Sequence, residues 1–123
     1  MIRVLAVDDH EEILHIVKSK LSKSGYEVET VNDAALVLQK TKEFKPQVIL
    51  MDIMMPKITG FELCRNIKSD KTLKKIKVIF LTAKDMDFAR DKAEEVGGDG
   101  FIAKPFSPNE LLDYINKLVS NFS

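Results

Sequence analysis

The sequence predicts a doubly wound α/β domain, in which helices cover both faces of a parallel sheet. Short apolar runs alternate with longer segments whose apolar residues recur at helical spacing, and this alternation is typical of successive βα units. The runs at 4–7, 48–51 and 78–81 are continuously apolar, as expected for strands that are buried on both sides. The pattern therefore favours a parallel sheet over an antiparallel one.

Length and composition are consistent with one domain over residues 1–123 that buries a single core. Apolar residues make up 45% of the chain and charged residues 31%, which is typical of a folded globular protein. Nineteen basic residues balance nineteen acidic ones, so no net charge favours nucleic acid or an anionic membrane as a partner. The sequence shows neither an apolar run of membrane-spanning length nor a secretion signal, and a cytoplasmic location is the expectation. Cys64, the single cysteine, is expected to be a small core residue.

The first expected helix covers residues 11–24 and ends at Gly25, a residue suited to a helix C-terminus. Its apolar residues at helical spacing are Ile13, Leu14, Ile16, Val17 and Leu21. Residues 26–31 instead alternate with a period of two and place glutamates on one side, which predicts an edge strand with a solvated face.

Asn32 or Asp33 can cap a second helix that continues to about Phe44 and stops before Pro46. A third helix is expected after Gly60, with Phe61, Leu63, Cys64 and Ile67 as its apolar stripe. The lysine-rich stretch 68–77 is interpreted as a solvated loop that leads to the next strand.

A fourth helix is expected over residues 85–96, with Phe88, Ala89, Ala93 and Val96 as buried positions. The last helix has a clear start, because Ser107 and Glu110 form a capping-box pattern around Pro108 at the first helical position. Five strands and five helices result. Right-handed crossovers and the edge position of strand 26–31 favour the flavodoxin-like strand order 2-1-3-4-5.

Polar residues stand where four of the expected strands end: Asp8 and Asp9, Asp52, Thr82, and Lys104. The carboxyl ends of parallel strands meet at one edge of the sheet, where ligands bind in open α/β folds. We therefore expect these side chains to line one crevice.

Clustered carboxylates repel one another unless some of them are protonated or a cation binds. Mg²⁺ is the natural cation for oxygen ligands and phosphate, with Mn²⁺ as an alternative. A carboxylate can then act as nucleophile toward a phosphoryl donor. The ammonium of Lys104 and the hydroxyl of Thr82 are suited to bind the equatorial oxygens of the transferring group.

These residues also carry a resemblance to a known family. The chain resembles, over essentially its whole length, the receiver domain of two-component response regulators, through Asp8-Asp9, Met51-Asp52-Ile53-Met54-Met55-Pro56 with Gly60, Thr82-Ala83 and Lys104-Pro105-Phe106. The resemblance implies a switch that accepts a phosphoryl group on Asp52 and catalyses only its own phosphorylation and dephosphorylation. Asp9 would bind Mg²⁺ directly, Asp8 through water, and Met54 through its backbone carbonyl. Lys104 would hold the phosphoryl group, and the Lys104–Pro105 bond would be cis.

The resemblance further implies that Thr82 moves toward the phosphoryl group and that Phe101 turns inward as part of the switch. Phe101 lacks the hydroxyl of the tyrosine that the family often has there. Met54 and Lys84 are expected at the mouth of the site. Because Met54 cannot orient an attacking water, slow self-dephosphorylation is predicted.

The implied partners are a sensor histidine kinase or a phosphotransfer protein, and an output partner of unknown identity. The output surface would comprise the fourth helix, the fifth strand and the last helix, and it would also suit a homodimer. No direct nucleic-acid or membrane binding is expected of this domain. Whether the receiver stands alone or belongs to a longer regulator stays open.

Three other classes of protein compete with this interpretation. A flavin carrier would need a phosphate-binding loop after the first strand, but the acidic segment from Asp8 to Glu12 at that position would repel phosphate. A phosphatase of the haloacid dehalogenase type would need an acidic residue at position 54, which is Met54. A pseudo-receiver that serves as a protein-binding module stays as the alternative. His10 is more consistent with a solvent-facing residue of the first helical turn than with a metal ligand, and His15 with a structural role.

Overall fold

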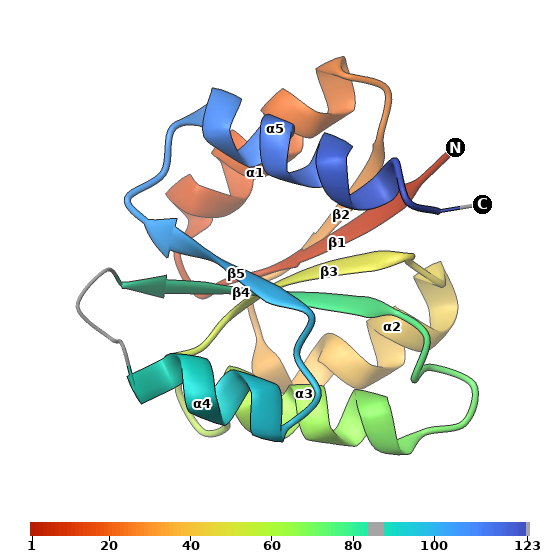
Figure 1. The fold of residues 1–123 in the computed structure, drawn as a ribbon, viewed down its shortest axis with the longest axis vertical. Helices are drawn as coiled ribbons and strands as arrows, with labels where there is room; N and C mark the ends of the chain where they lie inside the picture. The colour runs from red at the N-terminus through yellow and green to blue at the C-terminus, as the bar shows by residue number, and fades with distance from the viewer. Residues whose placement is uncertain (84–87, 123) are drawn as a thin grey trace.

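The computed structural model describes residues 1–83 and 88–122, without the side chain of Phe88 (Figure 1). The five strands are β1 (Arg3–Val7), β2 (Glu27–Val31), β3 (Val48–Asp52), β4 (Lys77–Ala83) and β5 (Gly100–Lys104). All pair in parallel, in the order β2-β1-β3-β4-β5. The expected doubly wound sheet and its strand order are therefore confirmed.

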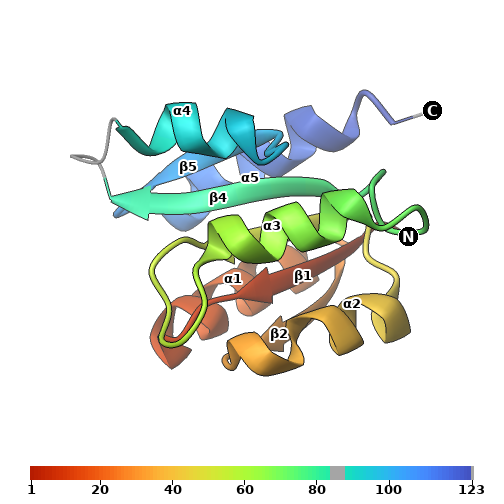
Figure 2. The same ribbon diagram turned by 90° about the horizontal axis from the view of Figure 1, so that it is seen from below.

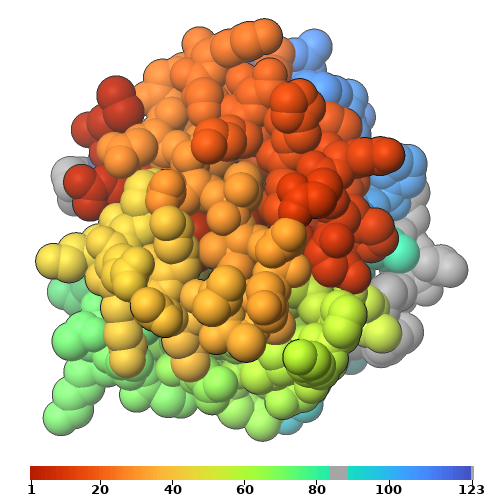
Figure 3. Space-filling model, turned by 180° about the vertical axis from the view of Figure 1, so that it is seen from behind, coloured from red at the N-terminus to blue at the C-terminus, as the bar shows by residue number. Residues whose placement is uncertain are grey.

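Helices cover both faces of the sheet in two layers (Figures 1 and 2). The helices are α1 (Glu11–Lys23), α2 (Val37–Phe44), α3 (Gly60–Ser69), α4 (Phe88–Glu95) and α5 (Pro108–Val119). α1 and α5 lie on one face, and α2, α3 and α4 lie on the other (Figure 1). The molecule seen from behind shows mainly the first half of the chain (Figure 3). β2 forms one edge of the sheet.

The core is divided by the sheet into two apolar layers. Alternate residues of β1 enter opposite layers: Leu5 and Val7 pack toward α2 and α3, whereas Val4 and Ala6 pack toward α1 and α5. All four are fully buried, which explains the continuously apolar sequence of this central strand. Burial of each large apolar side chain contributes roughly 1.5–3 kcal/mol, so the central strands contribute strongly to the stability of the fold.

Side-chain caps fix where three helical segments begin. Asp33 accepts a hydrogen bond from the backbone of Ala35 and starts a short 3₁₀ turn, Ala34–Leu36, before α2. Ser107 accepts from the backbone of Glu110 at the start of α5, with Pro108 as its first residue. Thr59 accepts from the backbone of Glu62 at the start of α3, a cap that was not predicted from the sequence.

Two sequence expectations about surface segments need correction. The stretch 68–77 is not simply a solvated loop: α3 continues to Ser69, and Leu73 and Ile76 are buried against the core. On α1, Ile16 is 41% exposed and His15 is exposed, so neither belongs to the core. The predicted start of the fourth helix at residue 85 lies outside the described residues.

Among the described residues, no helix is both long enough and apolar enough to cross a membrane.

Candidate functional site

The site lies at the edge of the sheet toward which the parallel strands point (Figure 2). The register aligns the strand ends, because Val7 pairs with Met51, Asp52 pairs with Leu81, and Ala83 pairs with Lys104. The residues that follow β1 and those that end β3, β4 and β5 are thereby brought to one place. The pairing of the strands thus brings residues that are far apart in the sequence into one site.

Three charged residues from three strands meet in the interior of this edge. Asp8 is fully buried and Asp52 is 5% exposed. The ammonium of Lys104 donates to Asp8 Oδ2 at 2.8 Å and to Asp52 Oδ1 at 3.3 Å. Lys104 therefore bridges the two carboxylates and compensates part of the cost of burying them.

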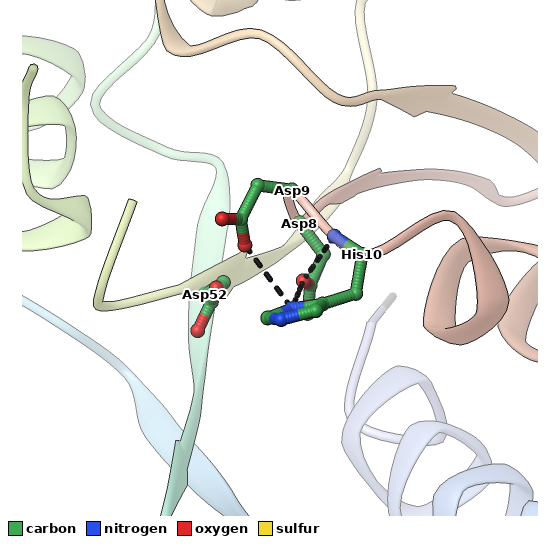
Figure 4. Close-up of side chains that lie close together, drawn as sticks. All are labelled: Asp8, Asp9, His10 and Asp52. Atoms are coloured by element: carbon green, nitrogen blue, oxygen red, sulfur yellow. Dashed lines mark hydrogen bonds and ion pairs between the residues drawn. The ribbon is translucent and has the colours of Figure 1, made fainter. Parts of the chain in front are cut away.

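Asp9 and His10 complete the cluster from the more exposed side. His10 Nδ1 lies 2.9 Å from Asp8 Oδ1 and 3.1 Å from Asp9 Oδ1 (Figure 4). One potential ligand atom from each of Asp8, Asp9, His10 and Asp52 lies within 4.8 Å of the others. His10 is at the N-cap of α1 and its ring is exposed, so the expectation of a solvent-facing residue is correct, but its contacts with the carboxylates were missed.

A pocket of about 180 Å³ opens beside the carboxylates. It is lined by His10, Asp52, Ile53, Met54, Leu81, Thr82, Ala83 and Lys104. The sequence-predicted residues Asp52, Thr82 and Lys104 are therefore brought together around one space. Met54 is 63% exposed at this pocket, whereas Lys84, its expected partner at the mouth of the site, lies outside the described residues.

The two buried carboxyl groups have opposite protonation tendencies. Burial and the charge of Asp8 raise the pKa of Asp52 to about 6. Burial also opposes ionisation of Asp8, but hydrogen bonds from Lys104 and His10 outweigh it and lower the pKa of Asp8. Burial likewise disfavours the charged form of Lys104, yet its contacts with Asp8 and Asp52 prevail and raise its pKa.

The donor set fits a hard divalent cation. Asp8, Asp9 and Asp52 supply oxygen ligands, and Lys104 supplies a single positive charge against three carboxylates. Burial is the main cause of the raised pKa of Asp52, and a divalent ion in this cluster would offset the second cause, the negative charge of Asp8. The loop after β3 is also closely packed, because a side chain on Gly60 would overlap the backbone oxygen of Asp52.

The two expected switch residues lie on neighbouring strands, β4 and β5. Thr82 is partly exposed, and its hydroxyl contacts the carbonyl of Ala83 at 3.4 Å. Phe101 is half-buried against the core, and the guanidinium of Arg90 on α4 lies 5.1 Å from the centre of its ring. The peptide bond between Lys104 and Pro105 is cis. No pattern in the sequence predicts this contact between Arg90 and Phe101.

The family model for the response regulator receiver domain matches residues 4–116. The chain belongs to this family. Protein PilG of Pseudomonas aeruginosa is 36% identical over 99% of this chain and 90% of its own length. The structure of chemotaxis protein CheY4 from Vibrio cholerae superimposes with a TM-score of 0.90 at 34% identity, over 95% of this receiver and 98% of CheY4.

Other relatives are longer than this receiver. The alkaline phosphatase synthesis transcriptional regulatory protein PhoP of Bacillus subtilis is 38% identical over 89% of this chain, which spans 45% of PhoP. This receiver likewise spans 53% of the probable transcriptional regulator ycf29 of Pyropia yezoensis. The membership of this chain implies phosphorylation-based signalling in a two-component system.

Proposed function

We propose that this receiver is a phosphorylation-dependent switch that accepts a phosphoryl group on Asp52. The donor would be the phosphohistidine of a sensor kinase or a phosphotransfer protein, or a small phosphodonor. The observation that carries the proposal is the position of Asp52, which ends a fully buried strand beside Lys104 and faces the pocket shared with Thr82. Asp8 is also buried but does not line this pocket. Among the described carboxylates, Asp52 alone is both buried and part of the pocket wall.

The residues around the pocket suggest the chemistry of the transfer. An oxygen of the Asp52 carboxylate would attack phosphorus, the bond from phosphorus to the donor atom would break, and its electron pair would leave with the donor. Lys104 would turn its ammonium from Asp52 to an oxygen of the phosphoryl group, and the hydroxyl of Thr82 would donate to another. Lys104 and Thr82 would thus stabilise the negative charge on the phosphoryl oxygens during transfer.

Mg²⁺ is the cofactor that the carboxylate oxygens of the site favour, with Mn²⁺ as an alternative. Asp9 and Asp52 would bind it through carboxylate oxygens, Asp8 through water, and Met54 through its backbone carbonyl. When bound, the ion would neutralise part of the charge on the phosphoryl oxygens. Asp52 would also ionise more readily beside it, since the ion offsets the charge of Asp8.

The same proposal covers signal output. Movement of Thr82 toward the phosphoryl group and of Phe101 into the vacated space would alter the α4-β5-α5 surface, where an output partner or a second copy would bind. The Arg90 guanidinium over Phe101 ties the aromatic ring to α4. Apart from its own phosphorylation and dephosphorylation, the domain would catalyse no reaction.

Incubation with acetyl phosphate and Mg²⁺, followed by intact-protein mass spectrometry, tests the proposal. The expected result is the addition of one phosphoryl group, lost in Asp52→Asn and retained in Asp113→Asn, a matched change on the exposed side of α5. No adduct should form when EDTA is present before the acetyl phosphate is added. If wild-type protein stays unmodified with both acetyl phosphate and a phosphorylated kinase domain, a pseudo-receiver that acts as a binding module would be favoured instead.

A further inference from the structure

The N-terminal end of α1 brings a nitrogen ligand to a cluster of carboxylates. His10 follows the Asp8-Asp9 pair directly, and its ring turns back over them instead of pointing away from the site (Figure 4). The ring also lines the pocket beside Asp52 and Lys104. Its position is held by the backbone, because the amide of His10 donates to Asp8 Oδ1 at 2.9 Å.

The distances around Nδ1 match the coordination shell of a metal ion. Nδ1 lies 2.9 Å from Asp8 Oδ1 and 3.1 Å from Asp9 Oδ1. Two ligands that bind an octahedral ion at about 2.1 Å and at right angles to one another are about 3.0 Å apart. The same two distances also suit hydrogen bonds, but a single Nδ1 hydrogen can make a linear bond to only one of the two oxygens. An ion bound directly to Nδ1 and to Asp9 Oδ1, with a bound water held by Asp8, would satisfy the lone pairs of all three groups.

We infer that His10 Nδ1 is a direct ligand of the ion at this site and makes it selective for first-row transition metals such as Mn²⁺ or Co²⁺ over Mg²⁺. The inference rests on the proposed function, since it specifies the metal of that same site. Imidazole binds transition ions well, whereas Mg²⁺ prefers oxygen and gives up its waters reluctantly. His10 would thus add affinity for a transition ion and little for Mg²⁺.

Binding of the ion to His10 replaces the hydrogen on Nδ1. The bond from the ion to Nδ1 forms on the lone pair that is left when the Nδ1 hydrogen departs as a proton to solvent. The ring keeps its other hydrogen on Nε2. Because the side chain of His10 is 66% exposed, the ring needs no rearrangement of the core to bind the ion.

The chain contains a matched control for this inference. It has two histidines, and His15 lies exposed on the same helix, outside the metal cluster. Replacement of His10 should leave the fold intact, because its side chain makes no cap hydrogen bond and its backbone amide would still donate to Asp8. His10→Gln keeps a side chain capable of hydrogen bonding but removes the imidazole ligand.

Titration calorimetry on tag-free, EDTA-treated protein with Co²⁺ or Mg²⁺ alone tests the inference. His10→Ala and His10→Gln should weaken Co²⁺ binding by at least about tenfold and change Mg²⁺ binding by less than about twofold. His15→Ala should change neither. In the proton NMR spectrum of the Co²⁺-loaded protein, direct binding should give a hyperfine-shifted exchangeable imidazole N–H signal that both His10 variants lose.

A loss of Co²⁺ affinity in the His10 variants below about twofold would overturn the inference, as would a Co²⁺ complex without the shifted imidazole signal. Absence of Co²⁺ binding to wild-type protein would also overturn it. The proposed function fails by a different result, namely the absence of phosphorylation on Asp52 in Mg²⁺. If the protein is phosphorylated normally but its Co²⁺ affinity is unchanged by the His10 substitutions, the metal preference alone is refuted.

Discussion

Replacement of Asp52 by asparagine should stabilise the metal-free protein at neutral pH. Asp52 is 5% exposed and lies near the negative charge of Asp8, and its pKa is raised from 3.8 to about 6. Between about pH 3.8 and 6 the folded state therefore holds a proton on Asp52 that the unfolded state has released, and at neutral pH it holds an ionised Asp52 whose burial lowers stability. Asparagine has nearly the shape of the protonated acid and carries no charge that burial would penalise.

The sign and size of the effect follow from this raised pKa. Stability that depends on the bound proton is complete below pH 3.8, falls as the pH rises, and is lost above about pH 6. A shift of about two pKa units corresponds to roughly 3 kcal/mol at most. We expect Asp52→Asn to increase the free energy of unfolding by about 2–3 kcal/mol at pH 7.5 and by about 1 kcal/mol at pH 4.5.

Urea unfolding in EDTA at both pH values, followed by circular dichroism, measures this difference. Asp113→Asn on the exposed side of α5 is the matched control and should stay within about 0.5 kcal/mol of wild type. Added Mg²⁺ should narrow the gap, because the ion relieves the same repulsion in wild type. Equal stability of wild type and Asp52→Asn at pH 7.5, or a gain that is the same at both pH values, would refute the electrostatic reasoning.

Four further predictions concern other parts of the structure. Lys104→Met should lower stability in EDTA by about 2 kcal/mol, because Asp8 loses its buried partner, and Mg²⁺ should restore part of the loss in urea titrations; an unchanged midpoint would contradict this. Gly60→Ala should cost about 3 kcal/mol in the same assay, since its Cβ would overlap the Asp52 backbone, and a cost below about 1 kcal/mol would show that the loop adapts. Cys64 should react with a thiol reagent at pH 8 only at the rate of unfolding, because it is fully buried and its pKa is raised to about 11; rapid labelling of native protein would rule this out. Exposed Met54 offers no polar group to orient water, so the phosphorylated protein should decay over minutes or longer by mass spectrometry, and decay within seconds would argue against it.

Local sequence patterns determined the order and type of the secondary structure elements. The continuously apolar strands are buried on both faces, whereas the alternating strand at 27–31 is buried on one. Both patterns can be recognised from the order of apolar and polar residues. Strong caps such as Ser107 also act locally, through the backbone of the next turn. The segment after α3 was less predictable, because Leu73 and Ile76 are buried by contacts distant in sequence.

The residues at the strand ends could be chosen from the sequence because parallel strands place their carboxyl ends at one edge. Distances and charges within the site could not be derived in this way. That Lys104 reaches both Asp8 and Asp52, or that Arg90 lies over Phe101, depends on side-chain directions across strands and helices far apart in the chain.

His10 shows the difference most clearly. The sequence places it next to Asp8 and Asp9 and predicts a solvent-facing side chain, which is correct for its exposure but does not reveal its contacts with the carboxylates. The path of the chain from β1 into α1 turns the ring over the site. The sequence by itself therefore determined which groups are available for chemistry, whereas the tertiary structure decided which of them touch, and thereby their protonation, because electrostatic interactions depend on distance and burial.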